Sequence, residues 1–298
     1  MKILFTADLH LLPGAHERTL FKVRDWIALY KPDALVVAGD LSTARDGECT
    51  LRDLRDCFPD GRIVVCMGNH DFWLPDFVRS ECRSLSEVIE RFWEPAAKEF
   101  DVTLLDSENL CLPGLAIVGG YGHYDLGFAV PGLCYDGIPV TRADYIRGWI
   151  SSKPTLRWRD CELMPGNSRP GAVATEQVAG VQRRLAAIDD RRVIVVLHTP
   201  PFEPLLGVPP IDSSMLHGAP SIYAFFRAYL GNRSMGEFLE KEHEKVTAVV
   251  CGHTHRQAGP LTLPGLGALG INVGSDYGAP RAVLFESELN RFERVPDW

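Results

Sequence analysis

The sequence lacks any long hydrophobic run. Its 298 residues contain no stretch of about 18 consecutive apolar residues, the length needed to cross a membrane. The opening residues, MKILFTADLH, pass from a short apolar stretch straight to acidic and histidine residues, unlike a signal peptide. We therefore expect a cytoplasmic protein with no membrane partner.

Paired cysteines and an excess of positive charge are also missing. The eight cysteines are scattered, with no C-x-x-C pair, so we expect reduced thiols and neither a zinc ribbon nor a thioredoxin-like motif. The formal charge of −8 opposes binding to DNA or to an anionic membrane, because such binding needs many lysine and arginine contacts to phosphates. A nucleic-acid partner is therefore not expected, and the oligomeric state is left open.

Low-complexity tracts and clear internal repeats are absent too. The composition, with 46% hydrophobic and 23% charged residues, is that of an ordinary globular protein. A chain of this length buries a large core without disulfides or a structural metal. Stability alone therefore demands no metal.

What the sequence does contain is the pattern of an α/β fold, in which short β-branched runs alternate with longer amphipathic stretches. Strands are expected at residues 3–7, 34–38, 63–67, 102–105, 115–119, 193–197 and 247–251, with a closing hairpin at 282–285 and 291–295. Helices are expected at residues 17–29, 49–58, 77–100, 174–188, 222–230 and 235–243. The pattern predicts a single domain over residues 1–298. Residues 121–170, rich in Gly, Pro and aromatic side chains and without a clear period, are interpreted as an insertion or lid.

Polar residues follow almost every predicted strand, at the carboxyl end where α/β folds build their sites. In chain order they are Asp8, His10, Asp40, Asn69, His70, Asp71, His198, His253 and His255. Side chains two residues apart on an extended segment point the same way, so the pairs at 8 and 10 and at 253 and 255 can each present two donors to one ion. Apart from His70 and Asp71, seven candidate ligands result.

Seven mixed nitrogen and oxygen donors exceed what one tetrahedral site uses. They suit two five- or six-coordinate ions about 3.5–4 Å apart that share a carboxylate and a water or hydroxide. Asp40 is the natural bridge, because the neighbouring Gly39 leaves room for close approach. The mixture of imidazole and carboxylate favours Mn, Fe, Zn or Co over Ca and Mg, which prefer oxygen ligands. We therefore predict two divalent ions, with Mn, Fe or Zn as the candidates.

Each motif also has a purely structural interpretation. Asp and Asn after a strand commonly cap the next helix, and a single histidine is usually a surface or packing residue. Asp40 and His198 are ordinary by themselves, whereas Gly68-Asn69-His70-Asp71 and Gly252-His253-Thr254-His255 are much rarer combinations. The complete set, in this order, favours the metal site.

In this order the motifs resemble the pattern of the calcineurin-like metallophosphoesterases, which runs D-x-H, G-D, G-N-H-[DE], H and G-H-x-H. The match extends from residue 8 to residue 255. The resemblance implies an α/β fold with two mixed β-sheets sandwiched between helices in four layers. It also implies two ligand sets, the first made by Asp8, His10, Asp40 and His255 and the second by Asp40, Asn69, His198 and His253.

The chemistry that follows is hydrolysis of a phosphate ester. Two cations lower the pKa of a bridging water toward about 7, and the resulting hydroxide attacks phosphorus in line. The metals and Asn69 stabilise the charge that builds on the phosphoryl oxygens. In the resembling family the histidine of the G-N-H motif, here His70, protonates the leaving oxygen. Asp71 is expected to fix the orientation of that ring.

Four further residues are candidates for substrate contact. His123 and Tyr124 follow a predicted strand, and His217 lies in a Pro-rich stretch further along the chain. Arg157 belongs to residues 141–170, which carry six basic against three acidic side chains and would help to bind an anionic substrate. A solvated surface is the competing explanation for that basic stretch.

The sequence thus predicts a metal-dependent hydrolase of phosphomonoesters or phosphodiesters that acts on a small-molecule or nucleotide substrate. One alternative is a non-catalytic scaffold that keeps the fold. Such proteins tend to lose ligands or the acid histidine, whereas all of them are present here. The other alternative is a DNA-processing nuclease, which the acidic charge disfavours.

Overall fold

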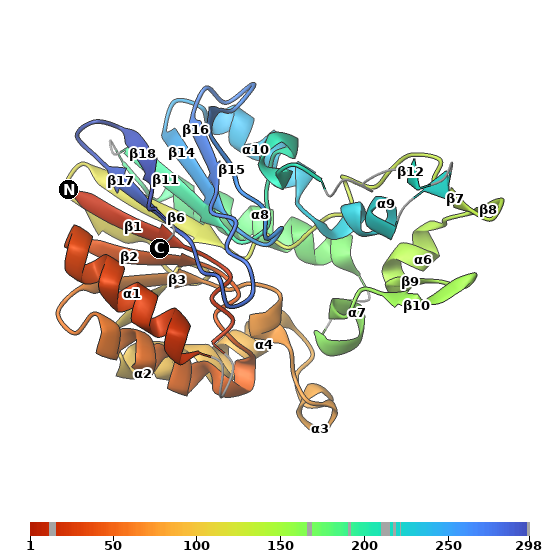
Figure 1. Cartoon of the computed structure of the whole chain (residues 1–298), viewed down its shortest axis with the longest axis horizontal. Coiled ribbons are helices and arrows are strands. Elements are labelled where there is room, and N and C mark those ends of the chain that lie inside the picture. Colours follow the sequence, from red (N-terminus) through yellow and green to blue (C-terminus); the bar gives the residue numbers. More distant parts are fainter. Residues whose placement is uncertain are drawn as a thin grey trace.

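Two six-stranded β-sheets form the centre of the protein (Figure 1). The computed structural model describes residues 1–11, 16–165, 169–189, 192–209, 215–216, 219–220 and 222–296. The first sheet has the order β18 (Arg291–Arg294), β17 (Ala282–Glu286), β1 (Lys2–Thr6), β2 (Ala34–Ala38), β3 (Arg62–Cys66) and β4 (Val102–Leu104). The second has the order β15 (Ala258–Thr262), β16 (Leu269–Asn272), β14 (Val246–Cys251), β11 (Arg192–Leu197), β6 (Leu115–Gly120) and β5 (Leu110–Leu112).

The central strands of each sheet are parallel. In the first sheet β1 to β4 run parallel, and β17 pairs with β1 in the antiparallel sense. In the second sheet β6, β11, β14 and β16 run parallel, with β5 and β15 antiparallel at the two edges. The carboxyl ends of the parallel strands in a sheet therefore lie along one side of it, which is where α/β proteins place their sites.

The two sheets pack face to face over an apolar core. Side chains alternate between the faces of a strand, so each strand contributes every second residue to this core. Ile3 and Phe5 of β1 share it with Ile194 and Val196 of β11. Because both faces of each sheet are covered, these strands are hydrophobic at nearly every position.

Helices cover the outer faces. The first sheet carries α1 (Glu17–Tyr30), α2 (Gly47–Cys57) and α5 (Glu94–Glu99), and the second carries α8 (Pro170–Ala186) and α10 (Arg233–Leu239). Figure 1 shows α1 and α2 on one side of the paired sheets and α8 and α10 on the other. The order helix, sheet, sheet, helix confirms the predicted four-layer α/β fold.

The expected insertion forms a group of short elements at one end of the molecule (Figure 1). They are β7 (Cys134–Tyr135), β8 (Ile138–Pro139), α6 (Arg142–Arg147), β9 (Trp149–Ile150), β10 (Lys153–Arg157) and α7 (Asp160–Leu163). With α9 (Ile222–Phe226) they enclose an aromatic core of their own, which contains Tyr124, Tyr145, Phe225 and Tyr229. A further short pair, β12 (Met215–Leu216) and β13 (Ala219–Pro220), lies close to α9 in the sequence. That residues 121–170 act as a lid stays a prediction.

The expected helix at residues 77–100 is wrong. The chain there forms α3 (Asp76–Arg79), α4 (Leu85–Val88), a π-helical turn at Ile89–Trp93 and then α5. The side chain of Ser84 accepts a hydrogen bond of 3.2 Å from the backbone N–H of Glu87, so it caps a new helix. The spacing of apolar residues in the sequence is helical across the whole range, but the Ser84 cap divides the chain into separate helices.

Candidate metal centre

The backbone is left-handed at five of the seven predicted ligands. The φ angles are 52° at Asp8, 44° at His10, 53° at Asp40, 71° at His253 and 55° at His255. Non-glycine residues rarely adopt this region, and each instance costs about 1–3 kcal/mol. Such strained residues cluster at functional sites. Here they turn the chain sharply just after β1, β2 and β14, so that the polar side chains project at the carboxyl ends of these strands.

The first predicted ligand set forms a compact cluster. Ligand atoms of Asp8, His10, Asp40 and His255 all lie within 4.8 Å of one another. The rings of His10 and His255 stack with their centroids 5.3 Å apart and their planes at 7°. The Nε2 atom of His10 is buried and has no hydrogen-bond partner among the described residues. A buried polar atom without a partner is costly, and a cation is the partner that this group of donors would accept.

The second predicted set converges equally closely. The Oδ1 atom of Asn69 lies 3.0 Å from His198 Nε2 and 3.0 Å from His253 Nδ1. The two imidazole nitrogens lie 3.1 Å from each other. The opposite ring nitrogens are held by carbonyl oxygens, His198 Nδ1 by Ala38 at 2.9 Å and His253 Nε2 by Tyr229 at 3.0 Å. If each of these nitrogens donates to its carbonyl, both remaining nitrogens present lone pairs toward Asn69, as metal ligands do.

The carboxylate of Asp40 lies between the two clusters. Its Oδ2 is 3.7 Å from His10 Nε2, and its Oδ1 is 3.4 Å from His198 Nε2. Glycines permit this approach. A Cβ atom on Gly39 would lie 2.3 Å from the Nδ1 atom of His198, and one on Gly68 would lie 2.2 Å from Oδ1 of Asp40. Asp40 therefore lies near histidines of both predicted ligand sets, and its role as a bridge stays a prediction.

Burial dominates the electrostatics of the cluster. It raises the pKa of Asp8 and of Asp40 well above the usual range, with repulsion from neighbouring carboxylates adding to the effect. Burial also raises the pKa of Asp71 to about 7. Burial lowers the pKa of His10 to about 2 and that of His253 to about 4, with repulsion between the rings adding to the shift. Cations bound there would relieve the carboxylate repulsion and use the neutral imidazoles as donors.

Asp160, from the insertion, holds the amide of Asn69. Its Oδ1 accepts hydrogen bonds from Asn69 Nδ2 at 3.0 Å and from Trp73 Nε1 at 2.8 Å. Its Oδ2 accepts one from Trp158 Nε1 at 2.9 Å. With the amide nitrogen fixed in this way, the amide oxygen of Asn69 points toward His198 and His253. Asp160 is buried, and burial raises its pKa to about 6.

His70 is held by Trp73 and by Asp40. Its ring stacks on Trp73 with centroids 3.7 Å apart, and its backbone N–H donates to Asp40 Oδ1 at 2.9 Å. The expected orientation of His70 by Asp71 differs from the structure. The carboxylate oxygens of Asp71 accept instead from the backbone N–H groups of Ser42, at 2.9 Å, and Gly68, at 2.7 Å. Asp71 therefore ties together the loops that carry Asp40 and Asn69.

A pocket of about 360 Å³ opens onto this cluster. Its lining includes the candidate ligands Asp40, Asn69, His253 and His255, together with His70. The other lining residues come from the insertion, from α9 and from nearby loops: Trp73, Arg157, Trp158, Arg159, Asp160, Tyr223, Phe226, Leu230, Thr254, Arg256 and Tyr277. The floor of the pocket is thus polar and its walls are largely aromatic and basic.

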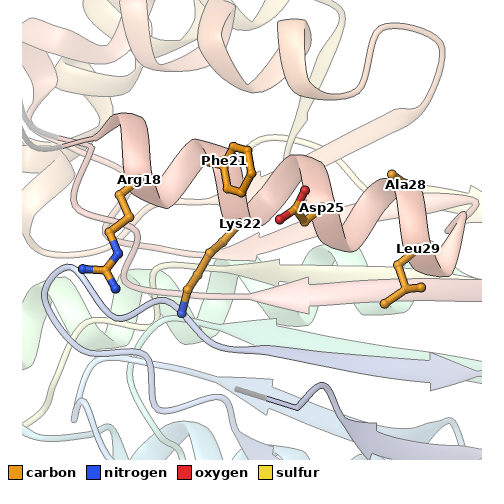
Figure 2. A pocket seen from close by; sticks show the side chains of 6 residues that line it. All are labelled: Arg18, Phe21, Lys22, Asp25, Ala28 and Leu29. Carbon is orange, nitrogen blue, oxygen red and sulfur yellow. The ribbon is translucent and has the colours of Figure 1, made fainter. Parts of the chain in front are cut away.

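A hollow of about 640 Å³ elsewhere has none of these features. It runs along the outer surface of α1, and its lining consists of Arg18, Phe21, Lys22, Asp25, Ala28 and Leu29 (Figure 2). All of these side chains belong to a single helix, and Phe21 is 62% exposed. The smaller pocket, in which donors from several strands converge, is therefore the candidate site.

Comparison with known proteins decides the family. The model of the calcineurin-like phosphoesterases matches residues 1–257. This chain belongs to the calcineurin-like phosphoesterase family. The resemblance expected from the motifs is thereby confirmed, and a metallophosphoesterase fold carries the candidate metal centre.

Solved structures agree on the fold of this chain. A dimetal phosphatase from Danio rerio superposes with a TM-score of 0.51 at 13% identity, over 95% of this chain and 92% of the other. Another structure superposes with a TM-score of 0.58 at 12% identity, over 100% and 99%. At such identities the likeness concerns the fold alone. No curated protein matches the sequence.

The structure places the four predicted substrate contacts in different surroundings. Arg157 lines the pocket, and its contact with a substrate stays a prediction. The expectation for His123 and Tyr124 is wrong in this structure, because both side chains are completely buried. Their rings pack on each other with centroids 4.1 Å apart, and Tyr124 belongs to the aromatic core beneath the insertion. His217 lies outside the described residues.

Sequence reasoning missed several residues of the pocket, among them Trp73, Asp160, Arg256 and Tyr277. Trp73 and Arg256 each lie within three residues of a recognised motif, so extending the motifs along the chain would have found them. Tyr277 stacks on His10 with centroids 4.2 Å apart although it is distant in sequence. Asp160 was counted only as one of the acidic side chains of the insertion. For Tyr277 and Asp160 the sequence carries no local signal.

Proposed function

We propose that this phosphoesterase hydrolyses phosphate esters of a small molecule or a nucleotide with two divalent metal ions. The observation that carries the proposal is the convergence of the seven predicted ligands, from both sheets, beneath one pocket that four of them line. A pair of bound ions supplies a water whose pKa is lowered toward about 7, and hence hydroxide at neutral pH. Mn, Fe and Zn all suit the mixed donors.

The residues present fit such a pair. His10 Nε2 is a buried nitrogen that lacks a hydrogen-bond partner among the described residues, next to the Asp40 carboxylate. On the other side, one amide oxygen and two imidazole nitrogens lie about a hydrogen-bond length apart. If the opposite ring nitrogens donate to their carbonyl oxygens, none of these three atoms carries a hydrogen for the others. Both arrangements favour a cation. We assign Asp8, His10, Asp40 and His255 to one ion and Asp40, Asn69, His198 and His253 to the other.

The chain's own groups then orient the ester. The Asn69 amide nitrogen donates one hydrogen to Asp160 and has a second N–H with which it can donate to a phosphoryl oxygen. His70 lines the pocket beside Asp40 and donates a proton to the leaving oxygen. Burial lowers the pKa of His70 to about 3 in the free protein, and a bound phosphoryl anion raises the proton affinity of the ring. Trp73 holds the ring in place.

Two other functions have weaker support. A non-catalytic scaffold needs neither a second ligand cluster nor a histidine in the pocket, yet this chain brings both together. A nuclease needs a basic path for the polynucleotide, whereas the chain carries a formal charge of −8 and two pocket arginines are paired with Glu162. The proposed substrate therefore remains a small phosphate ester, and the assay decides between a monoester and a diester.

Metal removal tests the proposal. The protein is stripped with a chelator, reloaded with Mn²⁺ and assayed with para-nitrophenyl phosphate, its bis ester, 2′,3′- and 3′,5′-cyclic nucleotides and single-stranded DNA. We expect turnover of at least one small ester that disappears on stripping and returns with Mn²⁺. Absence of turnover with Mn²⁺, Fe²⁺ and Zn²⁺, in a folded protein that binds two ions, would instead establish the scaffold. Cleavage confined to DNA would establish the nuclease.

A further inference from the structure

Arg256 is a cation in the pocket that has no anionic partner in the described part of the chain. It directly follows His255 in the sequence, and it lines the pocket with Tyr223. Its guanidinium carbon lies 4.6 Å from the centroid of the Tyr223 ring. The Nη1 atom is buried and has no hydrogen-bond partner among the described residues. The contact with Tyr223 offsets only part of the lost hydration of this group.

Other arginines of the chain show what a structural role requires. Arg55 donates to the carbonyl oxygens of Phe58, Gly61 and Phe100 at 2.7 to 3.0 Å. The structural role of such an arginine is to satisfy backbone carbonyl oxygens. Arg256 makes no such bond within the described part of the chain, and it lines the pocket, so its donors remain available to a ligand bound there.

The neighbouring arginines of the pocket share one carboxylate. Arg157 lies 2.9 Å from a carboxylate oxygen of Glu162, and Arg159 lies 3.4 Å from the other oxygen. Among the described lining residues, Arg256 is the arginine that has no carboxylate partner. Water would satisfy its donors but would not neutralise its charge.

Arg256 is seated on a side chain that belongs to neither ligand cluster. Tyr223, beneath its guanidinium, packs against Phe128, Leu206 and Leu230, and none of these is a candidate metal ligand. Because Arg256 is not a candidate ligand either, a phosphoryl group held by the metal ions leaves its donors to another part of the same molecule. Guanidinium groups bind phosphate and carboxylate by two parallel hydrogen bonds, which suits either anion.

We propose that Arg256, seated on Tyr223, forms a subsite for a second anionic group of the substrate. Resting on the proposed function, this inference narrows the substrate class to phosphate esters whose leaving group carries a phosphate or a carboxylate. The scissile phosphoryl group lies at the metal floor, and the second anion lies on the guanidinium.

Two matched substrate pairs test the subsite. One pair is 2-phosphoglycolate and ethyl phosphate, which differ by a carboxylate, and the other is adenosine 3′,5′-bisphosphate and adenosine 5′-monophosphate, which differ by a phosphate. For the Mn²⁺-loaded protein we expect Arg256→Gln to reduce the preference for the doubly anionic member, as a ratio of kcat/KM values, by about 10–100-fold in at least one pair. The pair that responds identifies the anion.

A binding measurement keeps this test separate from catalysis. Phosphonoacetate and ethylphosphonate cannot be hydrolysed at a phosphate ester, and they differ by the same carboxylate as the first pair. Calorimetry of the Mn²⁺-loaded protein should show that Arg256→Gln weakens the binding of phosphonoacetate more than the binding of ethylphosphonate, even if no ester is turned over. For a protein that prefers phosphate, adenosine 3′,5′-bisphosphate against the monophosphate gives the same comparison in calcium-loaded protein.

The control variant is Arg233→Gln. The guanidinium of Arg233 also lies over an aromatic ring, that of Phe128 at 5.2 Å, but it is outside the pocket lining. Arg233→Gln should leave the ratio of kcat/KM values unchanged in both substrate pairs. Arg256→Lys, which keeps the charge and loses the fork, should give a smaller reduction and replaces the glutamine variant if that one does not fold. Equal losses for both members of every pair, or no loss, would overturn the subsite even where metal-dependent turnover is intact.

Discussion

Replacing Asp40 with asparagine should reduce metal-dependent turnover by about a thousandfold or more. The carboxylate lies between both ligand clusters, 3.7 Å from His10 Nε2 and 3.4 Å from His198 Nε2. An amide has the same shape, and asparagine tolerates the left-handed backbone at this position. The variant therefore removes the charge that the two ions share and little else. Steady-state kinetics with Mn²⁺ measure the loss, and elemental analysis measures the bound metal.

Thermal unfolding separates loss of metal from loss of fold in this variant. Without metal, Asp40→Asn should not lower Tm, because it removes a buried carboxylate that repels Asp8 and Asp71. With Mn²⁺ at about 100 times Kd, the wild type gains about 2.7 kcal/mol of stability and the variant should gain much less.

A matched control is Asp106→Asn. Asp106 is another carboxylate whose pKa is raised by burial, and it accepts backbone N–H groups of Met67 and Tyr121 at 2.8 Å. It belongs to neither ligand cluster, so this variant should keep the Mn²⁺-dependent rise in Tm. Full activity and two bound ions in Asp40→Asn would contradict the assignment of Asp40 as the bridge.

Replacing His70 with alanine should cost about 10²–10⁴-fold in kcat for an ester with an alkyl leaving group. The loss should be much smaller for para-nitrophenyl phosphate, because nitrophenolate leaves without needing a proton. His70 lines the pocket and its ring is not part of either ligand cluster, so bound metal should remain at the wild-type amount. The measurement is kcat for both esters with the metal content determined on the same samples.

The exposed His243 provides the control for that experiment, since His243→Ala removes an imidazole that is outside the pocket lining. This variant should leave kcat unchanged for both esters. An equal loss for both esters in His70→Ala would mean that the ring positions the phosphoryl group rather than protonating the leaving group.

The sequence was sufficient for the parts of the site that are local. Asp8, Asp40 and Asn69 follow apolar strands within a few residues, and parallel strands bring their carboxyl ends together. The ligand positions could therefore be predicted from motif and strand pattern alone. The same reasoning gave the sheets, because strands buried on both faces are recognisable as continuous apolar runs such as Ala34–Ala38.

What could not be predicted depends on contacts between distant segments. Asp160 reaches Asn69 across 91 positions, and Tyr277 covers His10 from the far end of the chain. The role of Asp71 was misjudged for a related reason. Its neighbour in sequence is His70, but its carboxylate accepts a hydrogen bond from the backbone N–H of Ser42, which the fold brings alongside. Adjacency in sequence is therefore a poor guide to which groups a buried carboxylate serves.

The most direct test of the account is a crystal structure of the Mn²⁺-loaded protein with anomalous scattering recorded at the manganese edge. We predict two ions about 3.5–4 Å apart. One should be held by Asp8, His10, Asp40 and His255, and the other by Asp40, Asn69, His198 and His253. A single ion, or two ions that do not share Asp40, would contradict the central claim that this pocket is built around a bridged metal pair.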